Sequence, residues 1–383
     1  MRVLIAGAGI GGLCLAQGLH RAGIDVHVFE RCPSPEAFPA GYRIHIDPDG
    51  SRALHSCLPP ARFAEFVAAC GPPPRTFAFL DHRLRELLTV DVVAPGQKPD
   101  PIGQHRAVNR YRLRQTLLEG LAGRVQFGAE LVRYDQNGEV TAHFADGTRA
   151  TGDLLVGAEG THSPTRAQLL PHAERADTGV DCIAGRLALD TEVRALLPAQ
   201  LLDGPGLILA PGGRNVFAAV HDDMLVWGLS VRRSAGPRGG SLRTDALELS
   251  EGWHPDLRHI MELTRDFSSF TIRTARPVRD WPASRVTVLG DAIHSMPPSR
   301  GIGANTALRD AELLCRNLVS GMEPVAAVAD YERQMRRYGF AAVKASVAAQ
   351  KQGVIVNPLA FAASKAALRF FQAVPPVRRL VFG

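Results

Sequence analysis

Hydrophobic positions in the first thirty residues change their period twice. The apolar run RVLIA (2–6) predicts a short buried strand, and LCLAQGLHRAG (13–23) then shows apolar residues at helical spacing. The stretch IDVHVFE (24–30) returns to a strand pattern. A strand, a helix and a second strand in this order predict a β-α-β unit.

The middle of the chain follows a different pattern. Alternating apolar and polar runs at 125–158 are separated by Asn137-Gly138 and Asp146-Gly147, two dipeptides typical of hairpin turns. We therefore expect an antiparallel meander between helical units. Further alternating segments fill about 175–280, around a Gly/Pro/Arg-rich loop at 234–243, and predict a mainly antiparallel second domain. After Asn305 the pattern is helical nearly to the end.

Composition places the chain among ordinary globular proteins. It has 383 residues, 45% of them hydrophobic and 21% charged, and this length favours two domains over one core. The 44 basic residues exceed the 38 acidic ones and give a formal charge of +6. Of the basic residues, 40 are Arg and only 4 are Lys, which fits either codon bias or the binding of anions by guanidinium groups. No arginine run is long enough to predict a nucleic-acid surface.

Cysteine spacing and hydropathy exclude several other classes. Six scattered cysteines form no C-x-x-C pair, so we expect neither disulfides nor a metal site, and a reducing, cytoplasmic location. No stretch of eighteen or more apolar residues predicts a membrane span, and 1–19 reads as strand and helix rather than as a signal peptide. The C-terminal stretch 358–383 mixes apolar and basic residues, which favours packing across two domains over attachment to a membrane surface.

Glycines and an acid mark a dinucleotide site in the first β-α-β unit. Gly7, Gly9 and Gly12 form G-x-G-x-x-G directly after a strand and at the start of a helix, where the backbone and the helix N-terminus receive a pyrophosphate. Glu30 ends the second strand, eighteen residues after Gly12, and is placed to accept hydrogen bonds from a ribose. These residues alone leave both FAD and NAD open.

A second glycine-rich turn lies almost three hundred residues later. Asp291 follows the strand-like run VTVLG, so its carboxylate should emerge at the carboxyl end of a strand, where α/β folds bind ligands. The stiff segment Met296–Arg300 and the run Gly301–Asn305 then lead into a helix, whose first amides can approach a ligand closely. We expect both glycine turns to hold one ligand.

Three motifs in order resemble the class A flavoprotein monooxygenases with the p-hydroxybenzoate hydroxylase fold. The motifs are GAGIGG (7–12), DLLVGAEGTHSPTR (153–166) and GDAIHSMPPSRGIGAN (290–305), the last continued by TALRDA. The resemblance implies an α/β fold, a Rossmann-like FAD-binding domain with an inserted mixed, mainly antiparallel β-sheet substrate domain and C-terminal helices. We expect the FAD-binding domain at 1–72, 101–174 and 276–330, the substrate domain at 73–100 and 175–275, and a helical segment at 331–383.

The resemblance also assigns residues to the cofactor. Glu30 and Arg110 would hold FAD, Leu131 lies where the family contacts adenine, and Asp291 lies where it binds the ribityl chain. The whole implied cofactor set is Gly7, Gly9, Gly12, Glu30, Arg31, Arg43, Arg110, Leu131, Glu159, Asp291, Pro298, Gly301, Ile302, Gly303, Ala304 and Asn305. Position 159 departs from the family, which usually has Asp there. If NAD(P)H is the reductant, we expect it to bind transiently near Arg43, Glu159 and Arg166.

The implied reaction is oxygenation of a small hydrophobic molecule. In this family, reduced flavin and O₂ form a C4a-hydroperoxide whose distal oxygen attacks an electron-rich ring or alkene, with NAD(P)H as electron donor. We expect hydroxylation or epoxidation of an aromatic or polycyclic substrate, as in aromatic catabolism or secondary metabolism. Candidates for the substrate pocket, which also fit a plain core, are Arg186, Phe217, Met224 and Trp227.

Several points stay open at the level of sequence. No general base is identified: His45, His221 and His294 qualify by type, and His294 fits a structural role better. Rival interpretations are a flavin oxidoreductase of the same fold that does not oxygenate, an NAD-dependent Rossmann dehydrogenase, and a non-catalytic carrier of flavin or of a hydrophobic ligand. The sequence leaves the oligomeric state undetermined.

Overall fold

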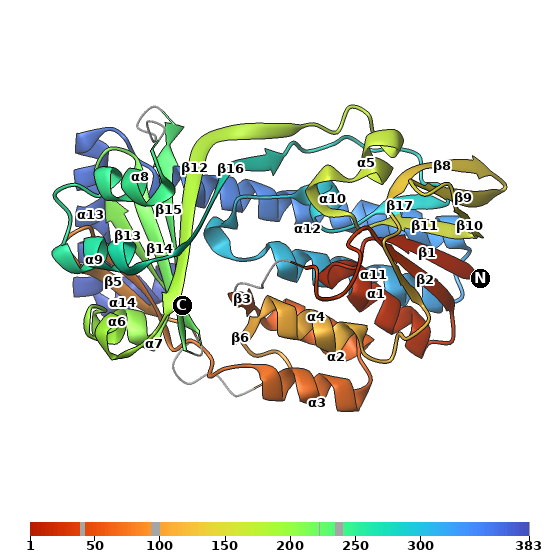
Figure 1. The fold of residues 1–383 in the computed structure, drawn as a ribbon, viewed down its shortest axis with the longest axis horizontal. Coiled ribbons are helices and arrows are strands. Elements are labelled where there is room, and N and C mark those ends of the chain that lie inside the picture. The colour runs from red at the N-terminus through yellow and green to blue at the C-terminus, as the bar shows by residue number, and fades with distance from the viewer. Residues whose placement is uncertain (39–42, 93–99, 222, 234–239, 383) are drawn as a thin grey trace. The chain divides into compact units, whose positions relative to one another are not determined.

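The chain folds into two compact units, each assembled from separate stretches of sequence (Figure 1). The computed structural model describes residues 1–38, 43–92, 100–221, 223–233 and 240–382. The first unit comprises Met1–Cys70, Asp100–Ala176 and Arg273–Val347, and the second comprises Gly71–Pro99, Asp177–Ile272 and Ala348–Gly383.

A five-stranded parallel sheet forms the centre of the first unit. Its order is β17 (Val286–Val288), β11 (Leu154–Gly157), β1 (Arg2–Ala6), β2 (Asp25–Glu30) and β7 (Val125–Phe127). The central strands are continuously apolar because both faces of the sheet are covered, one by helices that include α1 (Ile10–Arg21) and the other by a small antiparallel meander at 131–152. The predicted β-α-β unit is confirmed, with α1 between β1 and β2.

Two smaller sheets complete this unit. Strands β8 (Leu131–Asn137), β9 (Glu139–Phe144) and β10 (Arg149–Gly152) form an antiparallel meander, and its turns fall at the two predicted Gly-containing dipeptides. Strands β3 (Arg43–Ile46) and β6 (Arg106–Asn109) form an antiparallel pair. The remaining helical elements are α2 (Pro48–Cys57), α3 (Pro60–Ala69), α4 (Arg110–Leu118), η1 (Gly160–His162), α5 (Pro164–Leu169), α10 (Asp291–His294), η3 (Pro298–Arg300) and α11 (Gly303–Val319).

Helices α1 and α11 pack closely because small residues face the contact. A Cβ added at Gly11 would lie 2.8 Å from Leu289 Cδ1 and 3.2 Å from Ala307 Cβ. One added at Gly18, two turns along α1, would lie 2.6 Å from Cys315 Sγ, which is two turns along α11. The contacts advance together along both helices, so α1 and α11 run in the same direction and begin at the same end.

The second unit contains a seven-stranded sheet. Its order is β16 (Asp266–Ala275), β12 (Arg175–Ala188), β15 (Met224–Arg232), β14 (Arg214–His221), β13 (Gly206–Ala210), β4 (Thr76–Asp81) and β5 (Glu86–Asp91). Four of its pairings are antiparallel and that of β13 with β4 is parallel, as expected for a mixed, mainly antiparallel sheet. Its helices are α6 (Thr191–Ala195), α7 (Ala199–Asp203), α8 (Leu242–Leu249), α9 (Pro255–Leu263), α13 (Pro358–Ala373) and α14 (Pro375–Phe382).

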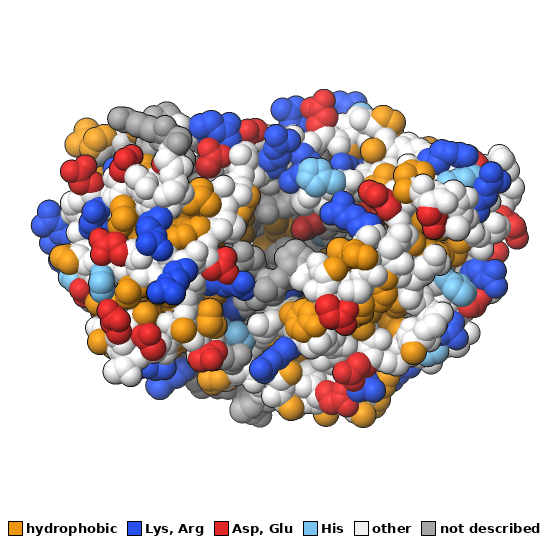
Figure 2. Space-filling view, in the orientation of Figure 1, with side chains coloured by type: hydrophobic (Ala, Val, Ile, Leu, Met, Phe, Trp, Pro, Cys, Tyr) orange, Lys and Arg blue, Asp and Glu red, His pale blue; other side chains and the backbone are white. Residues whose placement is uncertain are grey.

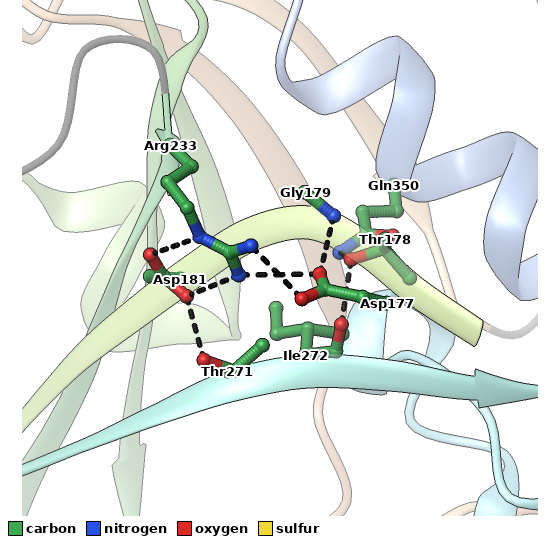
Figure 3. A network of polar contacts seen from close by, with 8 residues as sticks. All are labelled: Asp177, Thr178, Gly179, Asp181, Arg233, Thr271, Ile272 and Gln350. Atoms are coloured by element: carbon green, nitrogen blue, oxygen red, sulfur yellow. Dashed lines mark hydrogen bonds and ion pairs between the residues drawn. The ribbon is translucent and has the colours of Figure 1, made fainter. Parts of the chain in front are cut away.

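A charged network fixes strands β12 and β16 and the end of α12 (Pro324–Gly353) to one another within the second unit (Figure 3). Arg233 donates to both carboxylates, Asp177 and Asp181, at 2.9–3.2 Å. Asp181 also accepts a hydrogen bond from Thr271 on β16. Thr178 donates to the carbonyl of Ile272 at 2.7 Å and accepts from Gln350 of α12 at 3.2 Å.

The observed units differ from the predicted domains mainly at the C-terminal end. The predicted segment 331–383 is not a unit of its own, because 331–347 belongs to the first unit and 348–383 to the second. The other boundaries lie within three residues of those predicted. Helix α12 continues through the boundary between the units, so a helical pattern alone does not mark it.

Membrane-spanning potential and surface charge add two observations. In the described parts of the chain, no single helix has both the length and the apolar character needed to cross a bilayer. The pair Pro324–Gly353 and Pro358–Ala373 passes only when taken together, on length and composition, and is bent by 107°. On the face shown in Figure 2, basic and acidic side chains are interspersed.

Candidate functional site

Three sequence motifs meet at one edge of the parallel sheet. The glycine loop follows β1, the middle motif follows β11, and the Asp291 motif follows β17. These strands are neighbours in the order β17-β11-β1 and all run in the same direction. Segments separated by up to about three hundred residues are therefore brought together where α/β sheets bind their ligands.

The three motif glycines do different work. Gly7 has φ +104°, and a Cβ there would lie 2.6 Å from the carbonyl carbon of Ala158 in the middle motif. A Cβ at Gly12 would overlap the carbonyl oxygen of Gly7. A Cβ at Gly9 would meet nothing within 4 Å. The fold itself therefore requires glycine at 7 and 12, whereas Gly9 keeps open the space in front of the α1 N-terminus.

The peptide of Ala8 is held from both sides. Its N–H donates to Glu30 Oε2 at 2.8 Å, and its carbonyl accepts from Arg114 Nε at 2.9 Å. Glu30 Oε1 accepts a further hydrogen bond from the N–H of Cys32 at 2.9 Å. Glu30 is buried beside the glycine loop, and its carboxylate orders that loop, whereas its predicted contact to a ribose stays a prediction.

Arg114 also supports the glycine loop, and the sequence did not predict this role. It is buried on α4, its guanidinium carbon lies 3.3 Å from the centre of the Phe38 ring, and one terminal nitrogen has no partner. Burial lowers the pKa of this guanidinium. A signal was present in the sequence, because Arg114 shares the buried face of its helix with Leu113 and Leu117, where a charge is out of place.

The middle motif is ordered by its own acid. The carboxylate of Glu159 accepts hydrogen bonds from the Ser163 hydroxyl at 2.6 Å and from the hydroxyl and N–H of Thr165. Burial raises the pKa of Glu159. Arg166 donates to the carbonyl of Thr161 at 3.1 Å and to that of Ala292 at 3.0 Å, which joins the middle motif to α10.

A buried carboxylate supports the third motif. Asp310 on α11 accepts from the N–H of Gly290 at 2.7 Å, from His294 Nε2 at 2.6 Å and from the Tyr338 hydroxyl at 2.6 Å. Burial opposes protonation of His294, but contact with Asp310 outweighs it and raises the pKa of the imidazole. His294 is fully buried in this cluster, which fits the structural role expected for it rather than that of a general base.

Asn305 ties the beginning of α11 to β3. Its side-chain amide donates to the carbonyl of His45 at 2.9 Å and to that of Gly301 at 3.3 Å, and its oxygen accepts from the N–H of Asp47 at 3.0 Å. No side chain caps the α11 N-terminus, so the first amides of this helix stay available. Since α1 and α11 begin at the same end, two helix N-termini lie side by side, an arrangement that attracts anionic or electron-rich ligands.

Comparison with known proteins agrees with this geometry. Residues 1–346 match the family model described as FAD binding domain. The chain belongs to this FAD-binding family. It includes the p-hydroxybenzoate hydroxylase-type flavoproteins, so the resemblance stated from the motifs is confirmed, as are the fold class and FAD as the cofactor of the family.

Individual members of the FAD-binding family show how similar the chain is. It is 34% identical over 366 residues to the dual O-methyltransferase/FAD-dependent monooxygenase elcB of Phaeosphaeria nodorum. This alignment covers 81% of the present chain and 39% of elcB. It is 30% identical over 350 residues to the FAD-dependent urate hydroxylase of Klebsiella pneumoniae, at 87% and 85% coverage. The structure of Klebsiella pneumoniae HpxO with FAD and uric acid superposes with a TM-score of 0.83, at 25% identity and 97% and 93% coverage.

The chain spans less than half the length of the fungal relatives it matches, 39% of elcB and 44% of the CTB3 proteins of two Cercospora species. Each of these relatives is named for a methyltransferase activity as well as a monooxygenase activity. Family membership and fold are therefore shown for this chain, whereas its activity is argued from the site.

The residues at the sheet edge fit FAD. Gly9 leaves the α1 N-terminus open to a pyrophosphate, Glu30 lies at the end of β2, the position at which dinucleotide-binding folds receive a ribose, and Arg43 of β3 has a buried Nε without a partner. Burial lowers the pKa of Arg43 to about 10, still high enough to leave a positive charge at neutral pH. Gly9 and Glu30 would hold the phosphates and the adenosine half of the cofactor, and a contact of Arg43 to FAD stays a prediction.

Other predicted cofactor residues are placed but not assigned a role. Arg110 begins α4, and Arg110, Arg31, Asp291, Pro298 and Gly301 are exposed. Leu131 begins β8 and is buried beside Phe29 in an apolar cluster. Gly303 lies close to Asp291, since a Cβ there would come within 3.9 Å of the Asp291 carboxylate. Their contacts to FAD stay predictions, as do those of Ile302 and Ala304.

The four predicted substrate-pocket residues do not share one face of the second unit's sheet. Opposed residues lie on one face and successive residues alternate, so Arg186, opposite Val226, lies on the face of Met224 and Phe217. Trp227 lies on the other face, under α8 and α9, where its Nε1 donates to Thr264 at 3.0 Å. Trp227 is therefore a core residue, and the prediction that it joins the other three in a pocket is wrong.

The three residues on the common face differ in what they offer. Phe217 is 39% exposed, which makes it an accessible apolar side chain. Met224 is half-buried at the start of β15. Arg186 already pairs with Asp266 on β16, so its charge is partly neutralised within the unit. This face therefore offers apolar contacts rather than a free charge.

Proposed function

We propose that this chain is an FAD-dependent monooxygenase that uses NAD(P)H and O₂ to hydroxylate or epoxidise a hydrophobic, aromatic or polycyclic small molecule. One oxygen atom enters the substrate, the other leaves as water, and NAD(P)H supplies the electron pair. The observation that carries the proposal is the pair of parallel helix N-termini, α1 behind the open Gly9 and α11 behind Gly301 and Gly303, at one edge of the sheet.

Each part of the site has a defined task in this reaction. FAD, when bound, supplies the redox chemistry and activates oxygen. The amides at the start of α1 and the carboxylate of Glu30 bind its phosphate and ribose groups. The uncapped amides at the start of α11 carry partial positive charge, which would favour negative charge on a bound flavin.

Substrate binding is assigned to the part of the second unit's sheet face around Phe217 and Met224, next to the part of the same face that α13 covers at Leu207 and Leu209. Phe217 and Met224 would contact an apolar molecule there, and such a lining excludes water from the reacting atoms. The names of relatives support both hydroxylation and epoxidation as reaction types, since they include a urate hydroxylase, an aurachin C monooxygenase/isomerase and a zeaxanthin epoxidase. These names differ too much to select one molecule.

The electron donor is assigned to Arg43 and Arg166. Of the three residues predicted to receive NAD(P)H, Glu159 has both carboxylate oxygens engaged within the middle motif, whereas Arg43 and Arg166 each keep a buried Nε without a partner. A positive charge there suits the phosphates of a nicotinamide nucleotide.

The decisive experiment measures flavin colour, substrate-stimulated NAD(P)H oxidation and incorporation of labelled oxygen into the product. Purified protein should be yellow, or become so with added FAD, and a panel of phenols, quinolones and polyketides should contain members that accelerate NADPH or NADH oxidation. Under ¹⁸O₂ the product should gain a single labelled oxygen. Flavin binding with NAD(P)H oxidation that yields only hydrogen peroxide for every panel member would favour a non-oxygenating flavoprotein instead.

A further inference from the structure

Helix α13 presents an apolar face to solvent. Ten of its sixteen residues are exposed, and nine of these are apolar: Pro358, Leu359, Ala360, Ala362, Ala363, Ala366, Ala367, Phe370 and Ala373, with Arg369 the tenth. Leu359 is 81% exposed and Phe370 55%. Leu359, Ala363, Ala366, Phe370 and Ala373 follow one another at spacings of four and three, so they form a continuous stripe along the helix.

The opposite face of α13 is packed, so the exposed stripe is not a core face turned outward. Phe361 and Leu368 join the apolar cluster that contains Leu87 of β5 and Leu209 of β13. Gln372 accepts a hydrogen bond from the N–H of Thr89 at 3.0 Å. The helix is therefore fixed to the sheet on its inner side, and no described residue of the chain covers its outer side.

Basic residues accompany this face. Residues 348–383 contain five Lys and Arg (351, 365, 369, 378 and 379) and no Asp or Glu. The Lys365 amine lies 4.8 Å from the Phe361 ring at one flank of α13, and Arg369 is half exposed on the same flank. Helix α14 adds Arg378 and an exposed apolar side chain, Val381.

Two acids of the sheet beneath the helix contact its side chains. The buried Asp81 lies 3.8 Å from the Arg369 guanidinium. Glu86 accepts a hydrogen bond from Gln372 at 3.0 Å on the inner side. Neither acid belongs to the outer stripe, so an apolar stripe is bordered on one flank by the basic residues Lys365 and Arg369.

We propose that α13 and α14 dock on the surface of an anionic lipid bilayer. An interfacial helix of this kind places Leu and Phe side chains among the acyl chains and leaves flanking Lys and Arg at the negatively charged headgroups. A second copy of the chain fits the same face less well, because two such helices would bring together basic flanks with no acid on either helix to pair them.

The exposed outer side of α13 favours membrane contact more than the sequence did. Sequence reasoning favoured burial of the C-terminal stretch across two domains over membrane contact. The inner residues of α13 do pack, on the sheet of their own unit, but its outer half does not. Helix α13 is therefore apolar on two sides, of which one packs on the sheet and the other is exposed to solvent. A helix that docks on a second surface needs both sides.

Vesicle binding by the full-length, FAD-loaded protein tests the proposal. We expect cosedimentation with phosphatidylcholine vesicles that contain phosphatidylglycerol, weak binding to phosphatidylcholine alone, and release by salt. The double variant Leu359→Ser/Phe370→Ser should bind about tenfold or more weakly, because two apolar anchors are lost. The variant Lys351→Gln/Lys365→Gln should lose the preference for anionic vesicles.

Matched controls separate docking from loss of structure. The variant Val132→Ser/Phe270→Ser removes exposed apolar side chains elsewhere, at 50% and 47% exposure, and should bind vesicles like the wild type. Retained flavin absorbance and an unchanged melting temperature would show that each variant is folded. The proposal is overturned if the wild type ignores anionic vesicles, if the Leu359/Phe370 variant binds unchanged, or if sedimentation velocity shows a dimer that this variant abolishes.

Discussion

Substituting Gly9 and Gly7 separately by alanine distinguishes ligand binding from folding within one motif. At Gly9 the backbone has φ −74°, an ordinary value for alanine, and an added Cβ meets no atom within 4 Å. Loss of stability should therefore stay below about 1 kcal/mol, the cost of a poorer helix N-cap. The methyl group would instead occupy the space where a phosphate approaches the helix amides.

The expected loss falls on FAD affinity. Displacing one hydrogen bond to a charged group costs about 1.5–3 kcal/mol, which corresponds to an increase of about 10- to 150-fold in the dissociation constant. At Gly7, by contrast, φ is +104° and the Cβ would lie 2.6 Å from the Ala158 carbonyl carbon. Backbone strain of about 1–3 kcal/mol, together with this overlap, removes a large part of a typical stability of about 5–15 kcal/mol.

Two measurements on the same pair of variants check this reasoning. Titration of apoprotein with FAD, followed by quenching of flavin fluorescence, gives the dissociation constant, and thermal unfolding by circular dichroism gives stability. We expect Gly9→Ala to fold like the wild type and bind FAD weakly, and Gly7→Ala to unfold at a much lower temperature. If Gly9→Ala binds FAD as tightly as the wild type, the phosphate does not lie at the α1 N-terminus.

Three further predictions concern buried polar groups. Arg114→Met removes the donor to the Ala8 carbonyl and should weaken FAD binding about tenfold by titration, whereas Arg112→Met, at an exposed position on the same helix, should not. Burial raises the pKa of Glu332 from 4.5 to about 7, so the folded state holds a proton that the unfolded chain loses, and stability should fall by about 3 kcal/mol as pH rises through this window. Urea unfolding between about pH 5 and 8 should show that fall in the wild type and not in Glu332→Gln. Asn305→Ala leaves the part-buried carbonyl of His45 and N–H of Asp47 without these partners and should lower the free energy of unfolding by about 1–3 kcal/mol. An equal loss in apo and FAD-loaded protein would contradict any contribution of Asn305 to the cofactor site.

Local sequence patterns were enough to predict the first β-α-β unit and the hairpins. Continuous apolar runs with an intervening helix predicted β1, α1 and β2, and the Asn-Gly and Asp-Gly dipeptides placed the turns of the β8-β9-β10 meander. Such features depend on residues within a few positions of one another. The motif resemblance extended this to the fold class and to FAD, which the family comparison confirms.

Contacts between distant residues were beyond such reasoning. Nothing in the spacing of the chain shows that Arg114 would support the Ala8 carbonyl, or that Asp310 would gather Gly290, His294 and Tyr338. Trp227 was assigned to a pocket because it lies on a predicted strand, but which side of a sheet a residue faces depends on which side the helices cover. Here α8 and α9 cover the side of Trp227.

The sequence by itself determined the parallel unit, the two glycine turns, the antiparallel character of the inserted sheet and the family, because each follows from short-range periodicity or from motifs a few residues long. Tertiary structure alone decided that Gly9, rather than Gly7 or Gly12, is the glycine that leaves room for a ligand, that α1 and α11 begin side by side, and that the outer face of α13 stays bare. The physical reason is that empty space, parallel packing and exposure belong to pairs of segments distant in the chain, and are set only when those segments pack.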